Sequence, residues 1–316
     1  MAKKVLVIVL ISVLLFSLTC GFLFVNLATA GPLDRQYLPE LTIKSDGSIT
    51  IYQVSPSHEE SPALGLINRT ENIYTLTADI ENYSVRIDRS NILFDGGGHT
   101  INALGAFDNS GLEILQVTNV TVKNLEIIGE NPTSVFLASS NCFITNITTQ
   151  NALRVNGEYN TVIESSIKKI SLWGGGNHIS NCSISEMYIA SRSGSNIFTA
   201  NNILLNNVSA SFIVNTANFW DNGSVGNYWS NYTVKYPNAS ELGNSGIGDT
   251  AYVIDQNNID HYPLTYPYDV EKDEIVKSTQ EPETPSSFTP VIAGVSMVTA
   301  IGITSTVFYC RRYRKP

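Results

Sequence analysis

Basic residues and cysteines are both scarce in this chain of 316 residues. The sequence has 19 Lys and Arg against 28 Asp and Glu, which gives a formal net charge of −9. Six of the basic residues lie in the two terminal segments, so the region between them has 13 basic and 28 acidic residues. Such a surface repels phosphate groups and has no basic stripe, so we expect no nucleic acid partner. Cations and neutral glycans suit it better.

The four cysteines do not predict a disulfide framework, because Cys20 and Cys310 lie in apolar end segments and leave only Cys142 and Cys182. Copper handling calls for clustered imidazole or sulfur ligands. Met187 is the one methionine outside the terminal segments. The histidines are scattered along the chain, at His58, His99, His178 and His261. Copper binding is therefore not expected, and no cofactor is predicted.

The N-terminal segment, residues 1–30, has the features of a signal peptide. Lys3 and Lys4 precede an apolar run that reaches Val25, and small residues follow up to Ala30. Because the run is close to the ~20 residues that span a bilayer, an uncleaved anchor is the alternative.

The C-terminal segment predicts a membrane anchor. Residues 289–310 carry no charge and are followed by a basic tail at 311–316, which matches the positive-inside pattern of a cytoplasmic tail. A buried core helix is the alternative. Residues 269–288 are acidic and contain proline, as expected of a stalk. The sequence therefore predicts a single-pass protein of the cell membrane, with its main domain outside and its C-terminus in the cytoplasm.

A short pattern recurs in the middle of the chain: Asn, alternating apolar residues, then Asn or Ser and a further apolar residue. Copies begin at Asn91, Asn119, Asn141, Asn160, Asn177 and Asn196. From Asn119 onward the intervals are 22, 19, 17 and 19 residues, which is typical of one coil of a solenoid. In the same register, Glu126 is expected to face Thr148 and then Lys168.

The fold predicted from this pattern is all-β: a right-handed parallel β-helix flanked by the signal segment and the transmembrane helix. Inward apolar side chains form the core, and Asn at the corners can bond to the neighbouring coil. We expect an N-terminal cap at 31–90, coils at 91–214 and a C-terminal capping motif at 215–268. An antiparallel β-sandwich is the alternative, but it does not explain the recurring Asn.

Nine Asn-x-Ser/Thr sequons are candidates for N-glycosylation in an exported chain. They begin at Asn68, Asn82, Asn119, Asn146, Asn181, Asn207, Asn222, Asn231 and Asn238. Because Asn is also needed for turns, we expect only some of them to be modified.

Two segments resemble the NosD-type right-handed β-helix proteins, also called CASH domains, whose coils are known as PbH1 repeats and which are abundant on archaeal surfaces. One runs from Asn218-Phe-Trp-Asp-Asn-Gly through Gly246-Ile-Gly-Asp to Leu264, and the other includes Asn91-Ile-Leu-Phe-Asp-Gly-Gly-Gly-His. The resemblance covers roughly residues 65–264. It implies the β-helix fold and a surface location, and the family name derives from members linked to copper-site maturation.

Candidate sites for chemistry are few. In relatives the loop before Gly246 resembles a calcium site, but here only Asp249 remains, with Asp255 and Asp260 nearby as candidate metal ligands. Calcium prefers six to eight oxygen ligands, so hydrogen-bonded turns are the favoured interpretation. Sugar hydrolysis needs two carboxylates held close together, and acids do not recur at one register. No catalytic residue is predicted.

Aromatic residues are the stronger signal, because they can stack on sugar rings. The candidates are Trp173, Tyr228 and Trp229. The last two lie in the motif that resembles the family's C-terminal cap, where packing is favoured over ligand binding. For Trp173 the two interpretations are equally favoured.

The sequence therefore predicts a non-catalytic surface protein that binds glycans or partner proteins, or serves a structural role. One alternative is a carbohydrate-active lyase or hydrolase, which would show converging carboxylates from different coils. A second is an accessory protein for copper-site maturation, as the family name suggests.

Overall fold

The computed structural model describes residues 38–53, 60–62, 65–103, 110–128, 132–204, 216–269 and 274–275. The chain divides into two units, Met1–Lys277 and Ser278–Pro316, and the second lies outside the described residues. The predicted signal peptide and transmembrane helix also fall outside them. Among the residues described, no helix is long and apolar enough to cross a membrane.

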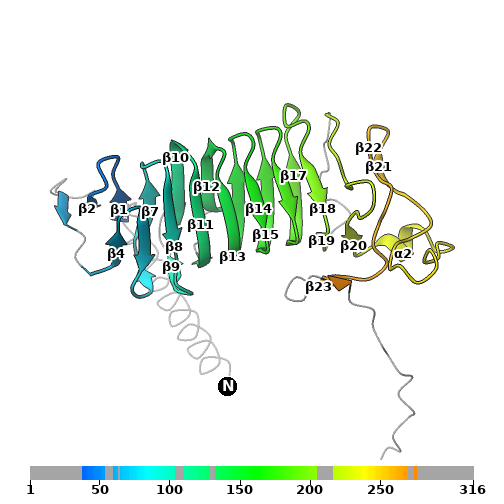
Figure 1. Ribbon diagram of the computed structural model, residues 1–316, viewed down its shortest axis with the longest axis horizontal. Helices are drawn as coiled ribbons and strands as arrows, with labels where there is room; N and C mark the ends of the chain where they lie inside the picture. Colours follow the sequence, from blue (N-terminus) through cyan, green and yellow to red (C-terminus); the bar gives the residue numbers. More distant parts are fainter. Residues whose placement is uncertain are drawn as a thin grey trace, which may run out of the picture. The chain divides into compact units, whose positions relative to one another are not determined.

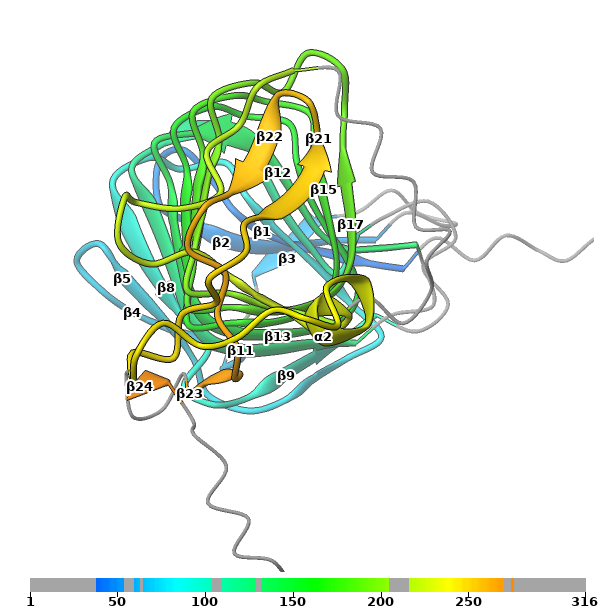
Figure 2. The ribbon, with the colours of Figure 1, turned by 90° about the vertical axis from the view of Figure 1, so that its right-hand side faces the viewer.

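The described part is an all-β parallel solenoid of about six turns (Figure 1). Viewed along the solenoid axis, the coils superimpose around a shared interior (Figure 2). Each coil contributes strands to three parallel sheets, which we call face 1, face 2 and face 3.

Face 1 contains β1 (Glu40–Ile43), β7 (Ser84–Ile87), β10 (Leu112–Thr118), β12 (Thr133–Ser140) and the C-terminal parts of β13 (Phe143–Val155), β15 (Ser166–Leu172) and β17 (Ser183–Ile189). Face 2 contains β5 (Ile73–Leu76), β8 (Ile92–Asp95), β14 (Thr161–Ile163), β16 (His178–Ser180), β18 (Ile197–Thr199) and the N-terminal parts of β11 (Val120–Ile128) and β13. Face 3 contains β6 (Ile80–Glu81), β9 (Thr100–Asn102), β19 (Asn202–Ile203), β20 (Tyr228–Trp229) and the remaining parts of β11, β13, β15 and β17.

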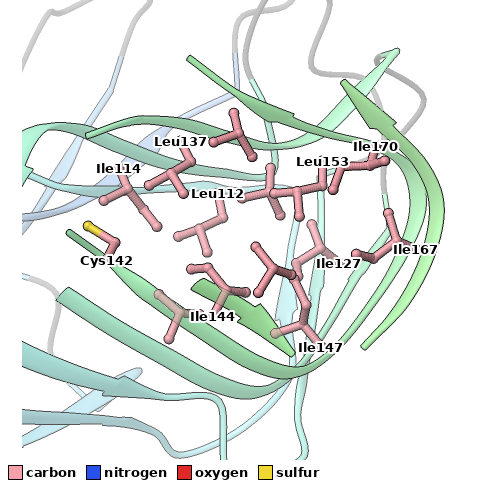
Figure 3. Close-up of a cluster of buried hydrophobic side chains, with 14 of the residues drawn as sticks. Leu112, Ile114, Ile127, Leu137, Cys142, Ile144, Ile147, Leu153, Ile167 and Ile170 are labelled. Atoms are coloured by element: carbon pink, nitrogen blue, oxygen red, sulfur yellow. The ribbon is translucent and has the colours of Figure 1, made fainter. Parts of the chain in front are cut away.

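The core follows from the period of two in each strand, because alternate side chains point to opposite sides of a sheet. In β11, for example, Val120, Val122, Leu125 and Ile127 are buried while the residues between them are partly exposed. Stacked coils align these side chains into one continuous core, part of which Figure 3 shows. Each buried Val, Leu or Ile contributes about 1.5–3 kcal/mol.

Left-handed backbone conformations make the corners. Between face 1 and face 2 the residues with positive φ are Asn91, Asn119, Asn141, Tyr159, Gly176 and Ser195. Between face 2 and face 3 they are Asn124, Asn146, Glu164, Asn181 and Ala200. Asn tolerates this conformation better than most residues. Asn119 Nδ2 donates to Asn91 Oδ1 at 3.0 Å, and Asn146 Nδ2 donates to Asn124 Oδ1 at 2.8 Å. These contacts confirm the predicted corner role.

A second kind of Asn points into the core. In one buried ladder, each backbone N–H donates to the side-chain oxygen of the next member at 2.9–3.0 Å. Its members are Asn160, Asn177, Asn196, Asn218 and Asn258. Trp220 Nε1 also donates to Asn258 Oδ1, at 3.0 Å. The ladder satisfies polar groups that would otherwise be buried without partners.

The predicted register is wrong by one residue in the middle of the chain. Because Phe143 pairs with Thr161, Asn141 stands opposite Tyr159, and Asn160 stands opposite Cys142. The interval between matching positions is therefore 18 residues and not 19. The repeat pattern had aligned a corner Asn, Asn141, whose φ is positive, with a ladder Asn, Asn160, whose side chain points into the core.

One predicted row of side chains is wrong by two residues. Glu126 faces Thr148 as expected, but the next residue in that row is Ser166 and not Lys168. The conclusion that acids do not recur in this row is unchanged.

Both ends of the solenoid are covered. At the N-terminal end, β2 (Ile49–Tyr52) pairs antiparallel with β1 and with β3 (Glu60–Pro62), and β4 (Ile67–Thr70) pairs antiparallel with β5. Parallel pairing already begins at β1 and β5, inside the region predicted as a cap. At the other end lie α2 (Tyr232–Lys235), the hairpin of β21 (Tyr252–Asp255) and β22 (Asn258–Asp260), and the pair β23 (Tyr268–Asp269) and β24 (Glu274–Ile275).

Candidate functional site

Four side chains on the outer surface of face 1 form a cluster that we call the aromatic–arginine patch: Phe136, Arg154, Trp173 and Tyr188. The parallel register places Phe136 beside Arg154, and Ser171 beside both Arg154 and Tyr188. Trp173 follows the end of β15, two residues after Ser171. The patch therefore spans four successive coils.

The guanidinium group of Arg154 contacts two rings of the patch. Its Cζ lies 5.3 Å from the centroid of Phe136 and 5.1 Å from that of Trp173, within the range of a cation–π contact. Its Nε donates to Asn156 Oδ1 at 3.1 Å. Among the ion pairs of the described residues, none involves Arg154. The two rings and the amide oxygen hold the guanidinium in place.

Trp173 remains 45% exposed although it contacts two members of the patch. Its ring lies 5.4 Å from that of Tyr188, with an interplanar angle of 43°. A large aromatic ring held in one orientation loses little conformational entropy on binding. Of the three aromatic residues predicted from sequence, Trp173 is exposed, Tyr228 is partly buried and Trp229 is buried.

Trp229 is packed inside the C-terminal cap, as the packing alternative predicted. It is 1% exposed, its ring stacks on Tyr252 at 4.0 Å, and Trp220 lies 5.5 Å away. Phe198 stacks on Trp220, with the two ring centroids 4.4 Å apart. Tyr228 is partly buried in β20. These rings close the end of the core, and Trp229 presents no face to a ligand.

The three predicted metal-ligand candidates have separate roles in the structure. Asp249 accepts from Ser240 N at 3.0 Å, and Asp255 accepts from Asn258 Nδ2 at 2.9 Å. Asp260 ends a second buried ladder, in which Asn201 N donates to Asn227 Oδ1 and Asn227 N donates to Asp260 Oδ2. In the part of the chain that the structure describes, no three His, Cys, Asp or Glu side chains gather to hold a metal ion.

Asp260 is a fully buried carboxylate held by N–H donors. Its Oδ2 accepts from Asn227 N at 2.7 Å and from Trp229 Nε1 at 2.9 Å, and its Oδ1 accepts from Tyr262 N at 3.1 Å. A Cβ at position 226 would lie 1.8 Å from Oδ1, so only Gly226 fits there. Burial raises the pKa of Asp260 to about 6, against the lowering effect of these donors.

A group of acidic residues surrounds Arg86 at the other end of face 1. Glu113 lies beside Arg86 in the register, and Arg86 Nε contacts Asp88 Oδ1 at 2.8 Å. Burial raises the pKa of Glu113, the Ser110 N–H lowers it, and the charge of Glu40 raises it further. Because Arg86 lies among these carboxylates, we interpret the group as an ion-pair network.

The sequons differ in what their side-chain amides do. The amides of Asn119 and Asn146 donate within the corner ladders. Asn231 accepts from Tyr252 Oη, and Asn222 Oδ1 accepts three hydrogen bonds within its own turn. Asn119 and Asn146 are exposed at the corners, and Asn68, Asn82, Asn222 and Asn238 are exposed nearer the ends of the solenoid. Asn181 is partly buried, and Asn207 lies outside the described residues.

Cys142 and Cys182 are both buried free thiols. Burial raises the pKa of both thiols, that of Cys182 to about 12. Cys182 therefore remains a protonated thiol at neutral pH.

Sequence analysis missed most of the aromatic–arginine patch. In sequence, Phe136, Arg154 and Tyr188 are ordinary residues of alternating strands. Their proximity depends on the coil register, which the Asn pattern gave with an error of one residue. Exposed Tyr159 was also missed, and its ring lies over Gly176, where a Cβ would approach it to 2.7 Å.

Fold and patch together define the class of this protein as a parallel β-solenoid with an exposed aromatic and cationic surface. No protein-family model, curated protein or solved structure matched the chain.

Proposed function

We propose that this chain is an exported, membrane-anchored β-solenoid that binds a glycan without transforming it, through the aromatic–arginine patch of face 1. The observation that carries the proposal is the exposed ring of Trp173, held between Arg154 and Tyr188. Apolar sugar faces can pack against such a ring, and the guanidinium N–H groups can donate to sugar oxygens.

The cellular context rests on the terminal segments. The apolar run at residues 1–30 and the uncharged stretch at 289–310 with its basic tail support export and a C-terminal membrane anchor. Residues 65–264 resemble NosD-type proteins, and this resemblance also supports a surface location. A partner protein is the second kind of ligand that such a surface could bind.

The test is a glycan-array screen of the detergent-purified full-length chain, with and without calcium. We expect saturable binding to at least one glycan and about tenfold weaker binding by Trp173→Ala, equivalent to about 1.4 kcal/mol. Tyr52→Leu, which removes a partly exposed ring from β2, is the matched control and should bind like the parent protein. A blank array, or equal binding by Trp173→Ala, would contradict the proposal.

A further inference from the structure

A row of outward side chains runs along face 2 through seven successive strands and ends at Phe219, which forms an isolated bridge to Ile197. Its members, which we call the face-2 row, are Ile73, Leu93, Thr121, Phe143, Thr161, His178, Ile197 and Phe219. With neighbouring strands about 4.8 Å apart, the row is about 34 Å long. It lies on a different sheet from the aromatic–arginine patch.

Four large apolar members of the row are exposed. The exposed fractions are 45% for Ile73, 37% for Phe143, 37% for Ile197 and 60% for Phe219. Isolated exposed apolar residues need no explanation. Four of them in one row, separated in part by polar members, indicate a contact surface.

The two ends of the row carry the same residue type, whereas the four middle positions do not match when the row is reversed. Large apolar residues occupy the first two positions and the last two, namely Ile73 and Leu93 at one end and Ile197 and Phe219 at the other. The middle positions alternate polar with aromatic. Reversing the row therefore places apolar side chains opposite apolar ones, with Ile73 facing Phe219 and Leu93 facing Ile197.

We propose that face 2 binds a second copy of this chain, with the two solenoids antiparallel around a twofold axis that lies in the interface, parallel to the strands. Such an interface is isologous, so one self-complementary surface is enough to build it. In the polar centre of the dimer, Thr121 faces His178, and Phe143 faces Thr161. Burial lowers the pKa of His178, so its imidazole is neutral at pH 7 and adds no charge to the interface.

The charges on face 2 fit the same arrangement. The strand residues of this face include one ion pair, in which Lys123 Nζ lies 3.1 Å from Asp95 Oδ2. The twofold axis places Asp95 opposite Thr199 and Lys123 opposite Ser180, so no like charges meet. In a chain with a net charge of −9, self-association is favoured at a surface that is neutral overall.

The first test is a disulfide cross-link in the full-length chain, with Cys20 and Cys310 replaced by serine. Leu93→Cys combined with Ile197→Cys should give a covalent dimer on oxidation, because position 93 of one copy lies opposite position 197 of the other. Either substitution alone should give none. The control pair Thr148→Cys and Ser183→Cys, on face 3, should stay monomeric. Equal cross-linking of the control pair would overturn the proposal.

The second test is the mass of the full-length chain in detergent, measured by sedimentation. We expect twice the 34.5 kDa of one chain. Ile197→Lys and Phe219→Lys should each produce monomers, since both place unpaired charges at the interface while leaving the core intact. Val234→Lys, at an exposed position in the C-terminal cap, should remain dimeric. A parent chain that is monomeric at tens of micromolar would overturn the proposal, and so would lysine variants that both remain dimeric. Binding of a glycan or an unrelated protein to face 2, instead of a second copy, would also overturn it.

Discussion

At the scale of single residues, Asp260 combines two opposing influences. Four hydrogen bonds from N–H groups favour its charged form, while burial disfavours it. Burial is the stronger influence and raises the pKa from 3.8 to about 6. The folded protein therefore binds a proton here more readily than the unfolded chain does.

This difference predicts a stability that depends on pH. A raised folded-state pKa gives stabilisation that is complete below pH 3.8 and is lost as the pH rises through about 6. Between pH 5 and pH 7.5 the loss is about 1.4 kcal/mol. Chemical unfolding followed by tryptophan fluorescence at both pH values would measure it, with Asp260→Asn as the comparison.

In Asp260→Asn the amide oxygen can still accept from Asn227 N and Trp229 Nε1, but the amide group does not titrate between pH 5 and pH 7.5. The variant should therefore lack this part of the pH dependence, while contributions from other groups are the same in both proteins. An unchanged pH profile in Asp260→Asn would show that another group is responsible.

At the scale of the structural elements, short strands are joined by corners that need polar partners inside the core. The buried Asn ladder supplies them, with each member bonding to the coil on either side. Asn177 accepts from Asn160 N and Asn160 Nδ2, and its own amide donates to Asn196 Oδ1. The corner backbone is thereby tied to the next coil at every step.

Replacement of Asn177 by alanine should be strongly destabilising, because it removes one acceptor and leaves buried N–H groups unpaired. Each unsatisfied buried group costs about 1–3 kcal/mol, so we expect a loss of roughly 2–5 kcal/mol in the free energy of unfolding. Asn257→Ala, at an exposed turn position, is the matched control and should change stability by less than about 0.5 kcal/mol. Similar stability of the two variants would show that the ladder contributes little.

At the scale of the whole molecule, a solenoid is stabilised by contacts between neighbouring coils, and its ends need protection. The C-terminal cap covers the last coils with Trp220, Trp229 and Tyr252, and Leu264 forms a bridge to Tyr228. The cap therefore belongs to the same folding unit as the coils.

Two truncations test this role of the cap. A chain ending at Lys277 keeps the cap and should be β-rich by circular dichroism and soluble. A chain ending at Ala217 loses the cap and should aggregate, since Phe198 and the edges of β18 and β19 become exposed. Solubility of the shorter chain would show that the cap is dispensable.

The sequence by itself determined the all-β parallel solenoid and the capping role of the motif after Asn218. Both depend on local information: the period of two in apolar residues, the recurrence of Asn near 19 residues, and a cluster of large rings at one end. Local information also explains why Asn119 and Asn146 could be placed at corners, since few residues adopt that backbone conformation easily.

Only the tertiary structure decided which Asn turn the chain and which fill the core, because Asn141 and Asn160 look alike in sequence and differ in the direction of their side chains. The same applies to both proposed surfaces. The aromatic–arginine patch and the face-2 row join residues that lie about one coil apart in sequence, and an error of one residue in register moves a side chain to the other side of the sheet. Hydrogen bonding between coils fixes that register, and it acts only once the coils are stacked.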